Sequence, residues 1–211
     1  KVKKYISPGN LLDIGCAMGF FMEEAEKQKF VSYGIEVSDF AAKIAQRHFG
    51  KRVYRGSVEN FIKNPKKIPQ FAKIKFNLIT LSDLIEHVQD PRGVLTGLKS
   101  SLSHNGVISI QTGDAGSFWA SIMGKNWHFF APPQHLYFFS KQTLTILLKQ
   151  AGYDIIKIEK VGKYVSLRYI LHMTQYMNVP LVGDYLNTIV SSNTIGKISL
   201  PIKLFDNMLV F

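Results

Sequence analysis

The sequence has few of several things, and each scarcity excludes a class of protein. A single cysteine, Cys16, among 211 residues leaves no disulfide within the chain and no zinc site built from several cysteines. No run of about 18 apolar residues occurs and nothing at the start resembles a secretory signal, so we expect no membrane span and a cytoplasmic protein. Acidic residues are scarce too, with 15 Asp and Glu against 26 Lys and Arg.

The resulting formal charge of +11 is concentrated in one region. Ten basic residues and a single acid, Glu59, lie between Lys43 and Lys75. Such a field could attract nucleic acid, an anionic membrane or an acidic substrate, but we expect a solvated basic face. With 46% hydrophobic and 19% charged residues, the composition is typical of a globular protein, and the length suits one domain over residues 1–211.

The most informative stretch is residues 10–19, which read N-L-L-D-I-G-C-A-M-G. An apolar run ends in Asp13, small residues follow with glycines at Gly15 and Gly19, and a helix pattern begins at Phe20. A buried strand, a glycine turn and a helix in this order begin the nucleotide site of a doubly wound α/β fold. The glycines are four apart, however, and a dinucleotide site requires G-x-G-x-x-G. A nicotinamide cofactor is therefore disfavoured.

A second acid follows at the expected distance. Residues 31–36 read as a strand that ends in Glu36, about 20 residues beyond the glycine turn. A carboxylate at that place in an α/β nucleotide site can accept hydrogen bonds from both ribose hydroxyls. The sequence therefore predicts a nucleoside-containing ligand.

The pattern D-x-G-x-A-x-G of residues 13–19 resembles motif I of the class I S-adenosylmethionine-dependent methyltransferases. Residues 82–91, S-D-L-I-E-H-V-Q-D-P, and residues 132–140 resemble the branch that includes the ubiquinone-pathway O-methyltransferases. The resemblance implies that the glycine turn and Asp13 hold the methionine end of the cofactor and that Glu36 holds its ribose. Adenine is usually held by an acid after the third strand, where this chain has Ser57, so Ser57 and the Val58 backbone, or else Glu59, take that role. The implied cofactor residues are Asp13, Gly15, Cys16, Ala17, Gly19, Phe20, Glu36, Val37, Ser57, Val58, Ser82 and Asp83.

The fold expected from these patterns is a Rossmann-like α/β domain with a seven-stranded, mostly parallel sheet, helices on both faces and a helical cap insertion over residues 163–200. A membrane-surface patch and simple packing on the sheet are the alternatives for that insertion. The spacing also places His48 on the core-facing stripe of a helix. The remaining expected helices are 20–27, 39–49, 91–103, 141–151 and 163–177, and the remaining expected strands are 52–55, 76–81, 107–112, 153–161 and 202–211.

The long aromatic connection over residues 113–139 is expected to form the substrate wall, because long loops in compact domains are usually functional. His128 and His135 lie in it, and an imidazole there could act as a general base. The alternative is that His135 merely hydrogen-bonds the loop. In some relatives, acids and a histidine at the positions of Asp83, Glu86 and His87 form a divalent metal site. Because the Glu-His pair also recurs in relatives where it is structural, we expect a structural role and no metal.

We therefore predict an S-adenosylmethionine-dependent methyltransferase acting on a small-molecule acceptor, at oxygen rather than nitrogen. We expect no nucleic-acid partner, a monomer or homodimer, and at most peripheral contact with a membrane. The rival function is a non-catalytic protein that uses this fold and its basic face to bind RNA or a protein partner.

Overall fold

The computed structural model describes residues 4–64, 68–166 and 199–211. Its core is a seven-stranded sheet in the order β3-β2-β1-β4-β5-β7-β6, and β7 runs antiparallel to both of its neighbours. The strands are β1 (Asn10–Ile14), β2 (Val31–Glu36), β3 (Val53–Arg55), β4 (Phe76–Ser82), β5 (Leu102–Gly113), β6 (Ile158–Ser166) and β7 (Ser199–Val210). The expected mostly parallel α/β sheet is confirmed.

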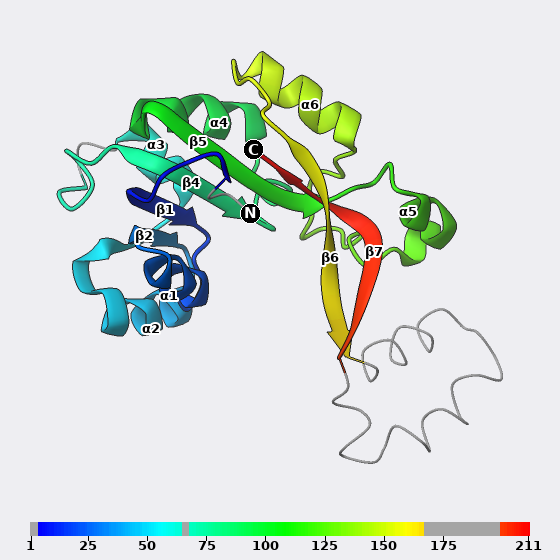
Figure 1. Cartoon of the computed structure of the whole chain (residues 1–211), viewed down its shortest axis with the longest axis horizontal. Coiled ribbons are helices and arrows are strands. Elements are labelled where there is room, and N and C mark those ends of the chain that lie inside the picture. The colour runs from blue at the N-terminus through cyan, green and yellow to red at the C-terminus, as the bar shows by residue number, and fades with distance from the viewer. Residues whose placement is uncertain (1–3, 65–67, 167–198) are drawn as a thin grey trace, which may run out of the picture.

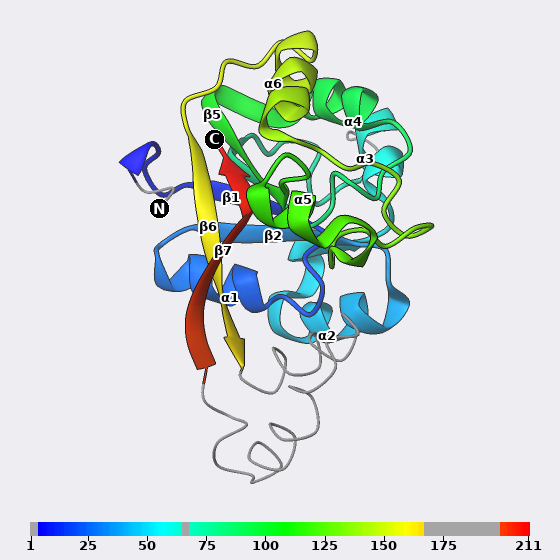
Figure 2. The ribbon, with the colours of Figure 1, turned by 90° about the vertical axis from the view of Figure 1, so that its right-hand side faces the viewer.

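Helices cover both faces of the sheet (Figures 1 and 2). One face packs against α3 (Val58–Lys63), α4 (Pro91–Leu98) and α6 (Lys141–Gln150), whose apolar side chains join those of the central strands in the largest buried cluster. Smaller clusters link α1 (Phe20–Lys27) and α2 (Asp39–Phe49) to the opposite face. Short 3-10 turns at Gly50–Arg52, Lys99–Ser101 and Gly124–Asn126 follow α2, α4 and a further helix, α5 (Phe118–Met123), respectively.

The helix starts follow from capping residues in the sequence. Ser38 and Ser140 accept hydrogen bonds from the backbone N–H groups of the first turns of α2 and α6, and Ser140 forms a capping box with Thr143. Gly152 follows α6 with a φ of 76°, a left-handed conformation that glycine adopts without a Cβ clash. Both helices therefore lie where the pattern predicts them.

Two expectations at the helices need correction. His48 is exposed, because the buried stripe of α2 consists of Ala41, Ala42, Ala45 and Phe49 and His48 lies beside that stripe. The helix at Pro91 ends at Leu98 and passes into a 3-10 turn, several residues short of the expected end.

The strands after α4 also differ from expectation. β5 begins at Leu102, five residues before the expected start at 107. Its pairing with β4 shifts from Phe76–Leu102 to Leu78–Val107, so residues 103–106 bulge from the ladder. The strand expected at 153–161 begins at Ile158.

The expected helix from Lys163 is wrong over Lys163–Ser166, which belong to β6. Pairing with Ser199–Ile202 of β7 satisfies their backbone groups in a ladder instead. β7 also begins three residues before the expected start at 202. The rest of the cap expected over 163–200, residues 167–198, lies outside the described residues.

The aromatic connection contains a helix that the sequence did not predict, α5 (Phe118–Met123), capped by Ser117. Its buried side chains Ala120 and Met123 pack with Trp127 and Phe129 in a small cluster of their own. In Figure 2, α5 lies beside the upper part of β7, which it contacts, and Figure 1 shows it on the side toward which the arrow of β5 points. The connection is therefore a packed wall at the edge where parallel strands end.

Candidate functional site

The candidate site begins at the carboxyl ends of β1 and β2, which are neighbours in the sheet. Asp13 is paired with Gly34 in the register, and Glu36 ends β2 two residues later. Because adjacent parallel strands end at the same edge, both acids reach the edge where α/β folds bind ligands.

The glycine turn between β1 and α1 is tightly folded against β2. The N–H groups of Gly15 and Cys16 both donate to the carbonyl of Ile35, at 2.8 and 3.1 Å. Gly19 has a φ of 90°, and a Cβ there would lie 2.8 Å from the ring of Phe49. Glycine at this position therefore allows the turn to approach α2 closely.

Glu36 fastens this turn from the side of β2. Its Oε2 accepts a hydrogen bond from the Ala17 N–H at 2.9 Å, and its Oε1 accepts one from the Ser38 N–H at 2.7 Å. The side chain is buried, yet each carboxylate oxygen has further acceptor capacity for a ligand hydroxyl.

Asp13 is buried on the same edge, and its Oδ1 accepts a hydrogen bond from the Thr80 hydroxyl at 2.6 Å. Burial raises the pKa of this carboxyl to about 7; the Thr80 hydrogen bond acts in the opposite direction, and the charge of Glu36 adds a smaller increase. Asp13 is thus a carboxyl that a nearby cation would convert to its ionised form.

Cys16 is an unsuitable nucleophile. Burial, with the nearby acids Asp13 and Glu36, raises the pKa of its thiol to about 12. Its sulfur instead fills the space above Gly34, where an added Cβ would lie 2.5 Å from Sγ. Cys16 therefore shapes the turn by packing.

The other predicted cofactor residues lie on the turns that follow the neighbouring strands. Ser57 is the N-cap of α3 and accepts from the Asn60 N–H, while the Val58 side chain is buried in the main core and leaves only its backbone for a ligand. Asp83 follows β4 with a φ of 48°. Ser82, Asp83, Phe20 and Val37 are all exposed along this edge.

A cavity of about 360 Å³ lies on the α1 side of the sheet. It is lined by residues of β1, β4 and β5, among them Thr80 and Ser82, and by Phe21 of α1. Its volume is in the range of small-molecule sites. Thr80, which lines this cavity, also donates a hydrogen bond to the Asp13 carboxylate.

The aromatic connection is joined to the turn after β4 through the main chain of Glu86. The Glu86 carbonyl accepts hydrogen bonds from the N–H groups of Leu136 and Tyr137, at 2.8 and 3.2 Å. His135, half-buried, is therefore held next to this turn, and its Nδ1 lies 2.6 Å from the Phe129 carbonyl. His128 is also half-buried, and its ring packs 4.6 Å from that of Phe129.

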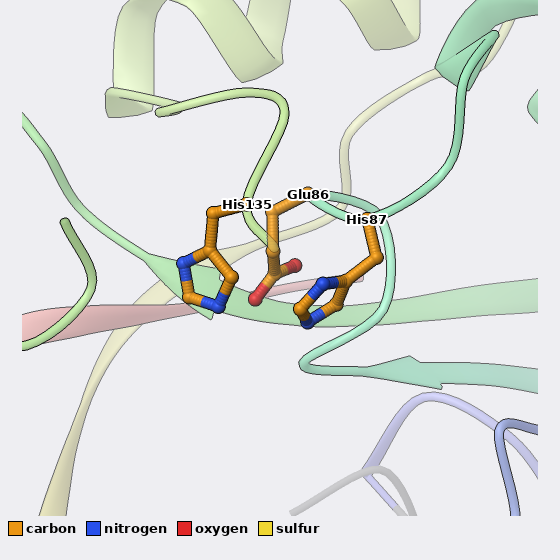
Figure 3. A group of neighbouring side chains, drawn as sticks. All are labelled: Glu86, His87 and His135. Carbon is orange, nitrogen blue, oxygen red and sulfur yellow. The ribbon is translucent and has the colours of Figure 1, made fainter. Parts of the chain in front are cut away.

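Three titratable side chains converge beneath this wall (Figure 3). One ligand atom each of Glu86, His87 and His135 lies within 4.8 Å of the others, a set that could hold a metal ion. The rings of His87 and His135 meet edge to face at 4.6 Å. The sequence singled out all three residues but did not bring His135 to the Glu-His pair, because 47 intervening residues separate His135 from His87. In the sequence, the only sign that these three residues could belong to one site was that all three are polar and titratable.

The sequence comparisons place this architecture among known proteins. A family model described as "Methyltransferase domain" matches residues 2–158. A ubiquinone biosynthesis O-methyltransferase of Pasteurella multocida is 32% identical over 111 residues, which cover 48% of this chain and 45% of that protein. The protein of the same name from Marinobacter nauticus is 24% identical over 76% of this chain and 75% of its own length. The chain therefore matches just under half the length of the first of these relatives.

Solved structures show the same fold at low sequence identity. A SAM-dependent methyltransferase from Archaeoglobus fulgidus aligns over 99% of this chain and 87% of its own, with a TM-score of 0.62 and 19% identity. The plantazolicin methyltransferase BpumL, solved in complex with SAH, aligns over 97% and 76% with a TM-score of 0.58 and 18% identity. Among the described residues, no helix combines the length and the apolar character needed to cross a membrane.

Proposed function

The chain belongs to the methyltransferase domain family, and from this premise we propose that it moves the methyl group of S-adenosylmethionine to a hydroxyl oxygen of a small-molecule acceptor. The single observation that supports binding of the cofactor is the position of Glu36. It is the last residue of β2, and its carboxylate accepts a hydrogen bond from the Ala17 N–H in the glycine turn. The glycines of this turn, Gly15 and Gly19, do not have the G-x-G-x-x-G spacing of a dinucleotide site, and Glu36 remains as an acid for the ribose.

The cofactor's groups match the chemistry of the strand ends. Asp13, whose pKa burial raises to about 7, faces the positively charged methionine end. Glu36 accepts from the ribose hydroxyls, and the Ser57 hydroxyl with the Val58 backbone lies after the next strand, where adenine would extend. Burial of Val58 supports a backbone contact there in preference to a side-chain one.

The acceptor half rests on the aromatic wall. Methyl transfer from a sulfonium needs the acceptor oxygen in line with the methyl group, and most of the rate enhancement comes from that positioning. His135 and His128 are the catalytic residues we assign, with His135 first because hydrogen bonds to its ring and to the next residue fix its place. An oxygen acceptor is supported by the two relatives, which carry O-methyltransferase in their names.

A calorimetric titration tests the cofactor half directly. S-adenosylmethionine should bind one per chain, while NADH and a short RNA should give no saturable signal at the same concentrations. Tight NADH binding, or RNA binding with no response to S-adenosylmethionine, would overturn the proposal. A second assay, methyl transfer from labelled cofactor to a panel of small hydroxyl compounds and their amino analogues, tests the choice of oxygen.

A further inference from the structure

The turn between β4 and α4, residues 83–90, is fixed to the core of the domain. The side chains of Ile85 and Val88 are buried in the largest hydrophobic cluster. The turn ends at Asp90, whose side chain caps α4 by accepting a hydrogen bond from the Gly93 N–H. Because close-packed side chains anchor it, this turn can hold another part of the chain in place.

The aromatic connection docks on this turn through main-chain groups. The Glu86 carbonyl accepts hydrogen bonds from two successive N–H groups, those of Leu136 and Tyr137, at 2.8 and 3.2 Å. Nearby, Nδ1 of His87 lies 2.8 Å from the Gln134 carbonyl. The turn therefore holds the main chain on both sides of the proposed base.

The hydrogen bonds of His135 itself lie within the aromatic connection. Its N–H donates to the Ala131 carbonyl at 3.0 Å, and its Nδ1 lies 2.6 Å from the Phe129 carbonyl. A carbonyl only accepts, so Nδ1 carries the hydrogen and Nε2 is left as the proton acceptor. Figure 3 shows the ring beside the turn after β4. Its place relative to the strand ends therefore depends on how the aromatic connection is held to that turn.

Tyr137 contributes a side chain to this contact. Its hydroxyl donates to the Gln89 carbonyl at 2.8 Å, so its side chain and its N–H bind two different residues of the turn. Its ring is stacked on that of Phe139, with centroids 5.8 Å apart and planes at 18°. Phe139 is buried in the largest hydrophobic cluster. Tyr137 thus joins the aromatic connection to the turn with its hydroxyl and to the core with its ring.

From these contacts, we propose that Tyr137 is a positioning residue that holds His135 in place through the Gln89 carbonyl. Tyr137 acts through His135 and not on the acceptor itself. A small displacement of a catalytic group can slow a reaction strongly, because the reacting atoms must be aligned. The inference rests on the proposed function for the role of His135, whereas the contact of Tyr137 with the turn is independent of it.

Tyr137→Phe, compared with Tyr153→Phe, tests the inference. Each change removes one hydroxyl that donates to a main-chain carbonyl, since Tyr153, just after α6, bonds the Leu95 carbonyl of α4 at 2.7 Å. Tyr137 and Gln89 are both exposed, so water can replace the lost bond and Tyr137→Phe should fold. The melting temperatures of both variants check this.

Two measurements need no acceptor. Amide exchange at positions 136 and 137 should be about fivefold faster in Tyr137→Phe, the factor that corresponds to one typical hydrogen bond, and unchanged in Tyr153→Phe. The NMR signals of the His135 imidazole should shift or broaden in Tyr137→Phe alone.

Turnover separates positioning from binding, with the hydroxyl compound that the wild type methylates fastest as the probe. The kcat of Tyr137→Phe should be about tenfold lower than that of the wild type, with the KM for this compound and the Kd for S-adenosylmethionine within about twofold. Tyr153→Phe should keep the wild-type kcat.

Unchanged exchange or unchanged His135 signals in Tyr137→Phe would overturn the inference, and so would a kcat within about twofold of the wild type. Equal effects of the two variants would show a general loss of stability and overturn it too. If the wild type binds no S-adenosylmethionine and methylates no compound, the proposed function fails. The exchange rates and the His135 signals then still decide whether Tyr137 holds His135 in place.

Discussion

The two halves of the proposed site, one for the cofactor and one for the acceptor, are built in different ways. The cofactor half uses the ends of adjacent parallel strands and short turns, so its acids sit where the strand register puts them. The acceptor half uses the connection between β5 and α6, whose residues come together through packing of α5, Trp127 and Phe129 and through the Glu86 carbonyl. A site of this kind can keep its cofactor chemistry while the wall, and with it the acceptor, changes.

The largest expected effect separates the halves at His135. His135→Ala should lower turnover by on the order of a hundredfold or more, because it removes the group assigned to the acceptor oxygen. Affinity for S-adenosylmethionine should stay within about twofold, since none of the proposed cofactor residues lies in the aromatic connection over residues 113–139. Turnover and calorimetry on the same preparation measure both, with His104→Ala, an exposed histidine on β5, as the control. Turnover within a few fold of wild type would contradict the assignment.

The matching change in the cofactor half is Glu36→Ala. It removes a carboxylate that bonds the Ala17 N–H and should weaken cofactor binding by roughly 1.5–3 kcal/mol, the scale of hydrogen bonds to a charged group. Asp154→Ala, which also removes one exposed carboxylate but lies between α6 and β6, is the control and should bind normally. If cofactor affinity of Glu36→Ala is unchanged, the ribose contact is misplaced.

Asp13 gives the comparison a pH dependence. Its pKa is raised from 3.8 to about 7 in the fold, so its contribution to stability is full below about pH 4 and is lost as pH rises through 7. A cationic cofactor favours the ionised form, so binding near pH 6 should release protons and tighten as pH rises. Binding enthalpies in buffers of different ionisation enthalpy measure the release. Asp13→Asn should abolish it, and wild type releasing none would count against the contact.

The smallest expected effect is that of the basic face. Replacing Lys43, Lys51 and Lys63 together by Gln should leave turnover on a small neutral acceptor within about twofold of wild type. These exposed residues flank β3, at the edge of the sheet opposite β6 and β7, so they lie outside both halves of the site. A large loss of turnover, or of an RNA interaction that the wild type shows, would favour the rival binding role.

How far the sequence predicted the site also differs between the halves. The sequence could place Asp13 and Glu36 because each lies at or next to the carboxyl end of a strand, and neighbouring parallel strands end at one edge of the sheet. The contact of His135 with Glu86 and His87 could not be predicted, because it depends on the path of the aromatic connection. That path leaves no periodic pattern in the sequence. The strand at Lys163–Ser166 was missed for a related reason, since its pairing with β7 outweighs the helical spacing of its side chains.

Ala17 shows what the closed turn costs. With a φ of 47°, Ala17 has a left-handed conformation that costs a non-glycine residue about 1–2 kcal/mol. Its N–H donates the hydrogen bond that the Glu36 carboxylate accepts. The strain and the hydrogen bond are therefore thermodynamically coupled. A loop that is already ordered loses little conformational entropy when it binds a ligand. The order of this loop depends on Glu36, nineteen residues from Ala17, and amide exchange at Ala17 would report it.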